Sequence, residues 1–396
     1  MLAPTRQPPT RSQPPVRPPS GPFGPVPSNA GRARRVLLLT ALILALPSVI
    51  SYASMLTNPS DSSLSIRTVE WLRDNGARAL VNKVENVYYS LTAPATGGPG
   101  LHALPQQAAA AGALAQARRA ARAVYRPPRI RPALHPALAG EGVWRPTFSG
   151  GGNRPPVLVT QFRPEALYPQ NVAGVAWIDH TRTSTWLYPG RLEPAVPLGS
   201  RGPMEIPNEL RSKLVASFNS GFKLTDSGGG FATGGHTYAR LKNGLATIMR
   251  YRDGTVDVGA WPYGPQAPSN VIYARQNLPL IVNNGRLNPN LSDGPQWGAT
   301  LGNAIRVWRS GLGIDRRGNL IYAAANDMTV GSLAQVLRRA GAVRAMELDI
   351  NVYWTSFITY RHPGAKGAAN LLASMDRSNQ RYLTTEDRDF FGVYLR

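Results

Sequence analysis

Polar and apolar residues alternate near the end of the chain, in the segment AMELDINVY at positions 345–353. The alternation predicts a β-strand, on which side chains two positions apart point to the same face. Glu347, Asp349, Asn351 and Tyr353 would then share one face, with neighbours about 6–7 Å apart. Carboxylates so close push each other's pKa values apart and can divide the acid and base roles of a reaction.

The same carboxylates also have a structural interpretation. Arg309 or Arg344 could neutralise Glu347 and Asp349 in ion pairs, and structural ion-pair networks perturb carboxylates as catalytic sites do. A glycosidase can use two carboxylates at such a separation. The pattern by itself leaves both interpretations open.

The elements that would position this strand are predicted just before it. Residues 306–314 and 319–325 form two strands joined by a turn, and Thr329 is a helix N-cap. The helix has one apolar face and ends before Gly341; the face comprises Leu333, Val336, Leu337 and Ala340. The strand–helix–strand order predicts that the strands at 319–325 and 345–353 form a parallel pair with a right-handed crossover.

From about residue 155 onward, short β-type runs are separated by turn signals. One of them, Arg252-Asp253-Gly254, is an Asp-Gly turn between two alternating runs and predicts a hairpin. The predicted fold class is α+β, with a mixed β-sheet and a few packed helices over residues 155–396.

The N-terminal third has a different character. Residues 1–35 are basic and rich in proline, which predicts a disordered tail. Residues 36–54 are apolar and uncharged, with Pro47 inside, and predict a transmembrane anchor. The preceding arginines place the tail in the cytoplasm and the rest outside, as a single-pass protein of the cell membrane. A cleaved signal peptide is the alternative, because Ser51-Tyr52-Ala53 resembles a cleavage site. Residues 55–154 are predicted to form a helical stalk followed by a low-complexity linker.

The composition limits the possible partners. The chain has 396 residues and a formal net charge of +22. No basic helix or nucleic-acid motif accompanies this charge, so nucleic acid is not an expected partner, whereas an anionic lipid or a phosphate-bearing glycan is. Cysteine is absent, which excludes disulfides and thiolate metal sites. We expect no metal and no cofactor, and the sequence does not indicate the oligomeric state.

The region from about 213 to 396 resembles the phosphodiester glycosidase family. Members carry three elements in order, Asn-Gly-Gly-Phe/Tyr, Arg-Thr/Ser-Ala-Ile/Leu-Gly and Asn-Leu-Asp-Gly-Gly-Gly-Ser. The corresponding segments here are Asn219-Ser220-Gly221-Phe222, Arg309-Ser310-Gly311-Leu312-Gly313 and Glu347-Leu348-Asp349-Ile350-Asn351. Residues 278–285 resemble a further family strand that ends in a polar turn at Asn284. The late element keeps Leu-Asp but lacks the glycines, so the segment around 350–356 must have another shape.

The resemblance implies roles for single residues. Asp349 would be the acid/base or sugar-binding carboxylate, and Arg309 would bind the phosphate. Asn219, Ser310, Asn284 and Asn351 would hydrogen-bond to the sugar or the phosphate. Glu347 is a catalytic candidate from the strand pattern alone, and Trp354 could stack on a sugar ring, although a core tryptophan is an equal alternative.

The expected function is the hydrolysis of a glycosyl phosphodiester in a cell-envelope glycan, by an extracytoplasmic domain anchored through residues 36–54. The alternative is a non-catalytic envelope protein that binds an anionic glycan or a protein partner through the same cleft. Convergence of Arg309, Asn219 and Asp349 on one pocket would favour the enzyme.

Overall fold

The computed structural model describes residues 29–105, 126–149, 154–197, 201–292, 294–298 and 306–396, in two compact units, Met1–Asn58 and Pro59–Arg396. The described part of the first unit is the helix α1 (Asn29–Thr57). Its stretch Gly31–Thr57 has a mean hydropathy of 2.2 and is long and apolar enough to cross a membrane. The helix extends beyond the predicted 36–54 at both ends, and residues 1–28 of the predicted tail lie outside the described residues.

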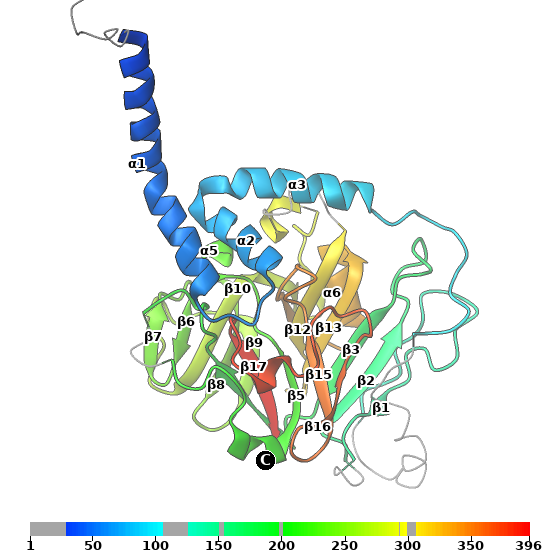
Figure 1. The fold of residues 1–396 in the computed structure, drawn as a ribbon. Helices are drawn as coiled ribbons and strands as arrows, with labels where there is room; N and C mark the ends of the chain where they lie inside the picture. Colours follow the sequence, from blue (N-terminus) through cyan, green and yellow to red (C-terminus); the bar gives the residue numbers. More distant parts are fainter. Residues whose placement is uncertain (1–28, 106–125, 150–153, 198–200, 293, 299–305) are drawn as a thin grey trace, which may run out of the picture. The chain divides into compact units, whose positions relative to one another are not determined.

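The described strands of the second unit form two sheets, and every printed pairing is antiparallel (Figure 1). The larger sheet has the strand order β1-β2-β3-β13-β12-β14-β10-β6-β7, with β8 and β11 also paired to β10, and β9 to β8. Its strands are β1 (Arg145–Pro146), β2 (Val157–Phe162), β3 (Ala173–Ile178), β6 (Phe231–Thr233), β7 (His236–Ala239), β8 (Leu245–Tyr251), β9 (Val256–Ala260), β10 (Val271–Asn283), β11 (Arg286–Leu287), β12 (Val307–Ile314), β13 (Leu320–Met328) and β14 (Arg344–Glu347).

The smaller sheet has the order β16-β15-β5-β17-β4. Its strands are β4 (Thr183–Tyr188), β5 (Leu214–Asn219), β15 (Phe357–His362), β16 (Lys366–Asn370) and β17 (Phe390–Leu395). Short helical segments connect the strands: the 3-10 turns η2 (Asn208–Lys213), η3 (Gly294–Trp297) and η5 (Arg381–Leu383), and the helix α5 (Leu224–Ser227). Two antiparallel sheets with few helices confirm the α+β prediction.

The main hydrophobic core lies between the two sheets. Phe218 of β5 is fully buried and has its ring centroid 5.6 Å from that of Tyr322 on β13 and 5.2 Å from that of Phe391 on β17. The other face of the larger sheet is covered by the helix α6 (Val330–Arg339), whose Leu333 and Leu337 are fully buried. Because α6 and the smaller sheet cover its two faces, β12 is buried along its whole length.

The hairpin and helix predicted around residues 306–341 are confirmed. Thr329 is the N-cap of α6, where its hydroxyl accepts from the backbone N–H of Ser332 at 3.0 Å. Gly311 of β12 faces this helix so closely that an added Cβ would lie 2.9 Å from Leu337. The Asp-Gly hairpin is also confirmed, since β8 and β9 pair across residues 252–255.

Two predictions about the last strand are wrong. β13 and β14 run in the same direction, but β12 lies between them and pairs with both, so they are not a hydrogen-bonded parallel pair. β14 also ends at Glu347 instead of continuing to residue 353. The chain leaves the strand because the Asp349 carboxylate accepts from the backbone N–H groups of Ile350 and Asn351, which closes a turn.

A helical segment that precedes the sheets in sequence packs against one end of them (Figure 1). It consists of α2 (Leu64–Leu72), a π-helical turn η1 (Arg73–Ala77) and α3 (Arg78–Leu91), with a kink where Gly76 has φ of +91°. We call residues 60–91 the cap. It belongs to the same compact unit as the sheets. Leu80, Val84 and Val87, at helical spacing on α3, are exposed on the cap.

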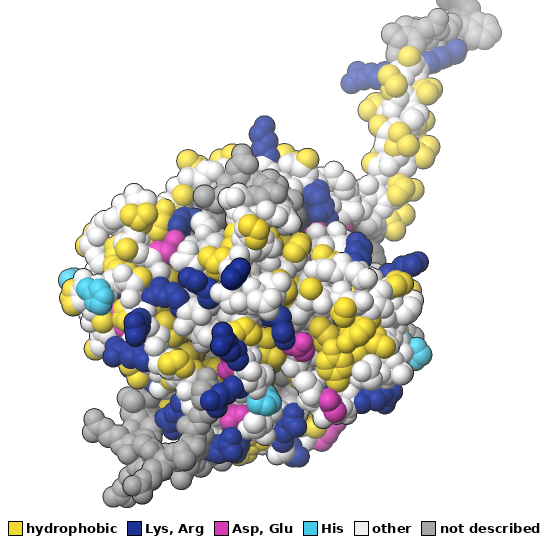
Figure 2. Space-filling view, turned by 180° about the vertical axis from the view of Figure 1, so that it is seen from behind, with side chains coloured by type: hydrophobic (Ala, Val, Ile, Leu, Met, Phe, Trp, Pro, Cys, Tyr) yellow, Lys and Arg dark blue, Asp and Glu magenta, His cyan; other side chains and the backbone are white. Residues whose placement is uncertain are grey.

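The described parts of the predicted linker also pack on the larger sheet. Ile130 is 1% exposed, and the fully buried Glu141 carboxylate lies 3.0 Å from the guanidinium of Arg163, just beyond β2. Lys and Arg side chains are spread over the face of the molecule shown in Figure 2, where Asp and Glu are fewer.

Candidate functional site

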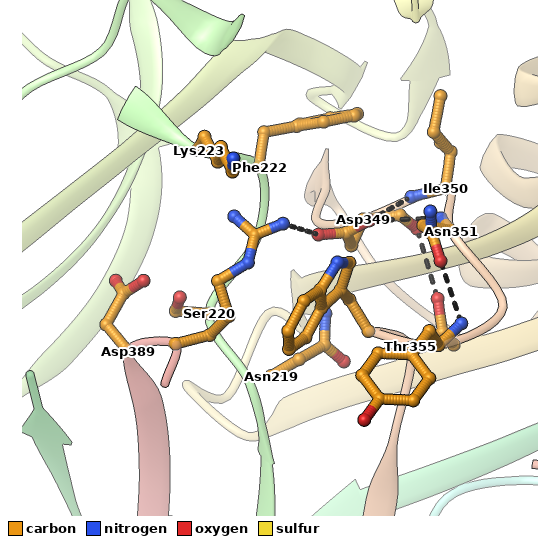
Figure 3. Close-up of polar contacts among 12 residues, drawn as sticks. Asn219, Ser220, Phe222, Lys223, Asp349, Ile350, Asn351, Thr355 and Asp389 are labelled. Carbon is orange, nitrogen blue, oxygen red and sulfur yellow. Dashed lines mark hydrogen bonds and ion pairs between the residues drawn. The ribbon is translucent and has the colours of Figure 1, made fainter. Parts of the chain in front are cut away.

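Asp349 lies at the end of β14, in a turn that fixes its carboxylate (Figure 3). Its Oδ1 accepts from the N–H of Ile350 at 2.8 Å and from that of Asn351 at 3.0 Å. The backbone of Asp349 is held to β12, because its carbonyl accepts from the N–H of Ser310 at 2.8 Å. The turn forms here with Ile350 and Asn351 at positions where the resembling element carries glycines.

Burial raises the pKa of Asp349 from 3.8 to about 6, against the opposing effects of the nearby Arg388 charge and of the two backbone N–H groups. The side chain is only 3% exposed, so the charged form loses most of its hydration. The negative charge of Glu70 raises the pKa further. Asp349 is therefore a carboxyl group that can be protonated near neutral pH.

This pKa predicts a pH-dependent effect of Asp349→Asn on stability. The folded state binds the Asp349 proton more tightly than the unfolded state does. The protonated carboxyl group therefore contributes its full stabilisation of the wild type below about pH 4, and this stabilisation is lost as the pH rises through 6. The rise from 3.8 to about 6 corresponds to about 3 kcal/mol. The free energy of unfolding of Asp349→Asn and of the wild type is measured by chemical denaturation between pH 4 and 7.5. Relative to the wild type, the variant should become more stable by about that amount as the pH rises. A difference that is constant with pH would show that the carboxyl group has an ordinary pKa in the folded state.

Arg388 is the cation next to Asp349. One guanidinium nitrogen lies 3.8 Å from Asp349 Oδ2, and the guanidinium carbon lies 4.5 Å from the centroid of the Trp354 ring. Burial would lower the pKa of Arg388, but the charges of Glu70, Asp349, Glu193 and Asp389 raise it above its usual value. Arg388 therefore stays charged although it is only 9% exposed.

A buried ion pair sets the positions of Arg388 and Lys223. Asp389, the next residue after Arg388, accepts from Arg275 of β10 at 2.6 Å. The same guanidinium donates to the carbonyl of Phe222, the residue before Lys223. Arg275 is fully buried, so its geometry is held by the core. Three distant parts of the chain are thus tied together beside Asp349.

Several buried donors around Asp349 have no hydrogen-bond partner in the described part of the chain. They are Nε and one terminal nitrogen of Arg388, Nε1 of Trp354 and the hydroxyl of Ser220. Native proteins rarely leave such groups unpaired, and each one needs an explanation. Unpaired donors beside a carboxyl group fit a ligand rich in oxygen atoms.

Asp349, Arg388 and Trp354 line a small cavity. Its lining includes Glu70, Lys223, Asp349, Asn351, Trp354 and Arg388. The free volume is about 30 Å³, room for about two water molecules. Sites for small organic ligands usually measure about 300–1,000 Å³. The cap closes the cavity, because Glu70 of α2 forms an ion pair with Lys223.

Further ion pairs hold the cap on the sheets. Lys223 lies 3.3 Å from Asp74, Arg78 lies 2.7 Å from Asp226, and Asp61 pairs with Arg377. Within the cap, Arg73 pairs with Glu85. The contacts are mostly polar, a type of interface that can separate more readily than an apolar core.

Arg309 and Glu347 lie away from this cavity. The two side chains form an ion pair of 2.6 Å, in which Glu347 is fully buried and Arg309 is 4% exposed. Arg309 also donates to the carbonyls of Met328 and Trp297. Arg309 therefore donates its hydrogen bonds inside the protein. This supports the structural interpretation, in which Arg309 neutralises Glu347, and argues against Arg309 as the phosphate-binding residue. The expected convergence of Arg309 with Asp349 on one pocket is therefore wrong.

Asn219 and Ser310 hold the backbone of Asp349 in place through hydrogen bonds. The Asn219 amide donates to the Ser310 hydroxyl at 3.2 Å, and that hydroxyl accepts from the N–H of Asp349 at 3.2 Å. Both side chains are buried and hydrogen-bonded within the protein. Asn284, by contrast, is exposed in the turn after β10, beside Val343 at the opposite end of β14.

Five charged cavity residues were not predicted from the sequence, namely Glu70, Arg73, Lys223, Asp226 and Arg388. Lys223 directly follows the Asn219–Phe222 element, and this position is the sequence feature that could have identified it as a site residue. Arg388 stands in an ordinary Asp-Arg-Asp run before β17, and Glu70 in a helix far from every family element. Within the described ranges, no group of three His, Asp or Glu side chains could hold a metal ion.

A larger hollow of about 370 Å³ lies elsewhere. It is lined by turns at the other end of the sheets, among them His180, Gly254 and Arg317, together with Arg396. The register of β12 and β14, in which Ile314 pairs with Arg344 and Gly311 with Glu347, separates this end from Asp349. None of the predicted site residues lines it.

Comparison with known proteins finds a family profile that is similar to part of the chain. The sequence profile of the phosphodiester glycosidases matches residues 212–349. No curated protein is similar in sequence. Among solved structures, the zebrafish N-acetylglucosamine-1-phosphodiester alpha-N-acetylglucosaminidase catalytic domain, auto-inhibited by its pro-peptide, is 15% identical with a TM-score of 0.42, covering 63% of this chain and 86% of its own. A hypothetical protein from Synechocystis is 15% identical with a TM-score of 0.36, covering 61% and 63%.

The profile match spans β5 to Asp349, which includes the first two elements singled out in the sequence and the Glu347-Leu348-Asp349 part of the third. Residues 212–349, about a third of the chain, are similar to the phosphodiester glycosidases.

Proposed function

We propose that this protein hydrolyses a glycosyl phosphodiester, with Asp349 as the acid/base group. The observation that carries the proposal is a carboxyl group with a pKa of about 6, next to Arg388 and within one cavity with Lys223. A carboxyl group that is protonated near neutral pH can donate a proton to a leaving oxygen. The similarity of residues 212–349 to the phosphodiester glycosidases supports the reaction class.

The reaction needs one proton to move out and back. The bond between the anomeric carbon and the phosphate oxygen breaks, and that oxygen takes the proton of Asp349 as the phosphomonoester leaves. Water adds its hydroxyl to the anomeric carbon and returns its second proton to the Asp349 carboxylate. Asn219 and Ser310 are positioning residues, since they hold the backbone of Asp349. Asn351 and Trp354 line the sugar side of the cavity.

The protein would act outside the cytoplasm, tethered by α1. This part of the proposal is supported by the apolar residues 36–54 of α1, whose side chains are largely exposed in their own unit, and by Arg32, Arg34 and Arg35, which precede them. An envelope glycan that carries phosphate is the substrate class that fits this location and the basic surface.

The non-catalytic alternative is favoured by two observations. Arg309 and Asn219 do not line the cavity of Asp349, and the volume of this cavity is only about 30 Å³. A protein that binds an anionic glycan on its surface would not need to open this cavity. A hydrolase must open this cavity, because a sugar does not fit into a space that holds about two water molecules.

The two functions separate in a substrate-pair assay with the full chain. A glycosyl phosphodiester and the neutral methyl glycoside of the same sugar are incubated with the protein, and free sugar is measured. We expect release from the phosphodiester with a kcat/KM at least about tenfold higher, the effect of one charge-assisted hydrogen bond to the phosphate. Release of sugar from neither compound, across a panel of sugars, would favour the binding protein, and a preference for the neutral glycoside would contradict the reaction class.

A further inference from the structure

The cations of the cavity are already neutralised by a carboxylate from the cap. Glu70 of α2 is an ion-pair partner of Lys223. The Arg388 and Lys223 charges lower the pKa of Glu70 to about 2, although burial acts in the opposite direction. The Glu70 carboxylate is thus held as an anion in a place from which water is largely excluded. Lys223 and Arg388 together select a negatively charged oxygen group.

We infer that Lys223 and Arg388 form an anion-binding subsite for the phosphate of the substrate, and that Glu70 occupies this subsite when the cap is closed. The inference rests on the proposed function only for the identity of the ligand. The site itself is defined by the two side chains, which line one cavity, and by the Glu70 carboxylate, which pairs with Lys223.

Two independent features point to a ligand with more oxygen atoms than Glu70 provides. Arg388 keeps Nε and one terminal nitrogen unpaired among the described residues, and Nε1 of Trp354, which also lines the cavity, is unpaired as well. A phosphate group offers more acceptor oxygens than a carboxylate does and can accept from a planar guanidinium at two points. The buried Arg275–Asp389 pair holds the backbone at Phe222 and Asp389, so the subsite does not depend on the cap for its shape.

Competition between Glu70 and phosphate follows from this geometry. Phosphate can bind only in the fraction of molecules in which Glu70 has left Lys223, and the apparent affinity falls by that fraction. Removing the Glu70 charge should therefore strengthen phosphate binding. If Glu70 were instead a second catalytic carboxylate, its removal would leave phosphate binding unchanged and abolish turnover.

The test uses the full chain and inorganic phosphate as the probe, with affinity measured by calorimetry. For Glu70→Gln we expect phosphate to bind about tenfold more tightly or better, the factor for losing one competing charge-assisted hydrogen bond. Glu165→Gln is the matched control, because it removes a carboxylate that pairs with Arg306, and neither of these two residues lines the cavity. It should bind phosphate as the wild type does.

A second substitution assigns the gain to the subsite. In Glu70→Gln/Lys223→Gln the gain should disappear, since half of the subsite's charge is gone. An unchanged affinity in Glu70→Gln, or a gain that survives in the double variant, would overturn the inference. Glu70→Asp, which withdraws the carboxylate by one methylene, should give an intermediate affinity and replaces the first variant if that one does not fold.

Failure of this inference differs from failure of the proposed function. Phosphate binding is measured without turnover, so a tighter complex in Glu70→Gln supports the subsite even if no glycosyl phosphodiester is cleaved. Conversely, sugar release by a protein whose phosphate affinity does not respond to Glu70 would support the enzyme and reject this subsite.

Discussion

Glu347→Ala is expected to lower the free energy of unfolding by about 3–5 kcal/mol, because it leaves the Arg309 charge buried without its partner. Glu347 is fully buried, Arg309 is 4% exposed, and the two are 2.6 Å apart. The backbone carbonyls of Met328 and Trp297 accept from Arg309 but carry no compensating charge. Denaturant unfolding of the variant and the wild type at the same pH measures the loss.

A double replacement is the control for this prediction. Exchanging both partners, as in Glu347→Leu/Arg309→Met, removes the unpaired charge and should recover most of the lost stability, since an apolar pair of similar volume often replaces a buried ion pair at little cost. A Glu347→Ala protein that is as stable as the wild type but does not release sugar would contradict the structural role and restore Glu347 as a catalytic candidate.

The local elements of the fold were predictable because their signals lie within a few residues. Thr329 caps α6, the apolar face of that helix is buried, and the Asp-Gly turn closes a hairpin. The pairing of β13 and β14 was not predictable in the same way. A strand–helix–strand order determines the common direction of the two strands, but the insertion of β12 between them depends on contacts far apart in sequence.

The end of the last strand shows where periodicity fails. Residues 345–353 alternate as a strand does, but the Asp349 side chain competes for the next two backbone N–H groups and turns the chain. The predicted row of polar side chains on one face therefore breaks after Glu347. That residue remains in the sheet with Arg309, whereas Asp349 and Asn351 reach the cavity.

The cations of the candidate site illustrate the same limit. The sequence suggested Arg309 as the phosphate-binding residue, because it begins a recognisable element. The cavity instead contains Arg388 and Lys223, which are brought together by Arg275 through contacts that span more than one hundred positions. No local pattern marks a residue whose role depends on such distant packing, and the same holds for Glu70 of the cap.

The central claim is that Asp349 carries the proton in sugar release, and one comparison tests it most directly. Asp349→Asn keeps an oxygen that can accept from the two backbone N–H groups, but it cannot exchange a proton. Asp315→Asn is a matched control, because Asp315 accepts from the N–H groups of Arg317 and Asn319 in a similar turn at the other end of β12. Both variants are assayed for sugar release per folded molecule from the same glycosyl phosphodiester.

We predict that Asp349→Asn lowers kcat by about 10²–10⁴-fold, the usual contribution of a general acid, while Asp315→Asn retains sugar release. Wild-type kcat should fall as the pH rises through about 6, where Asp349 loses its proton. An Asp349→Asn protein that is folded and releases sugar at the wild-type rate would contradict the account.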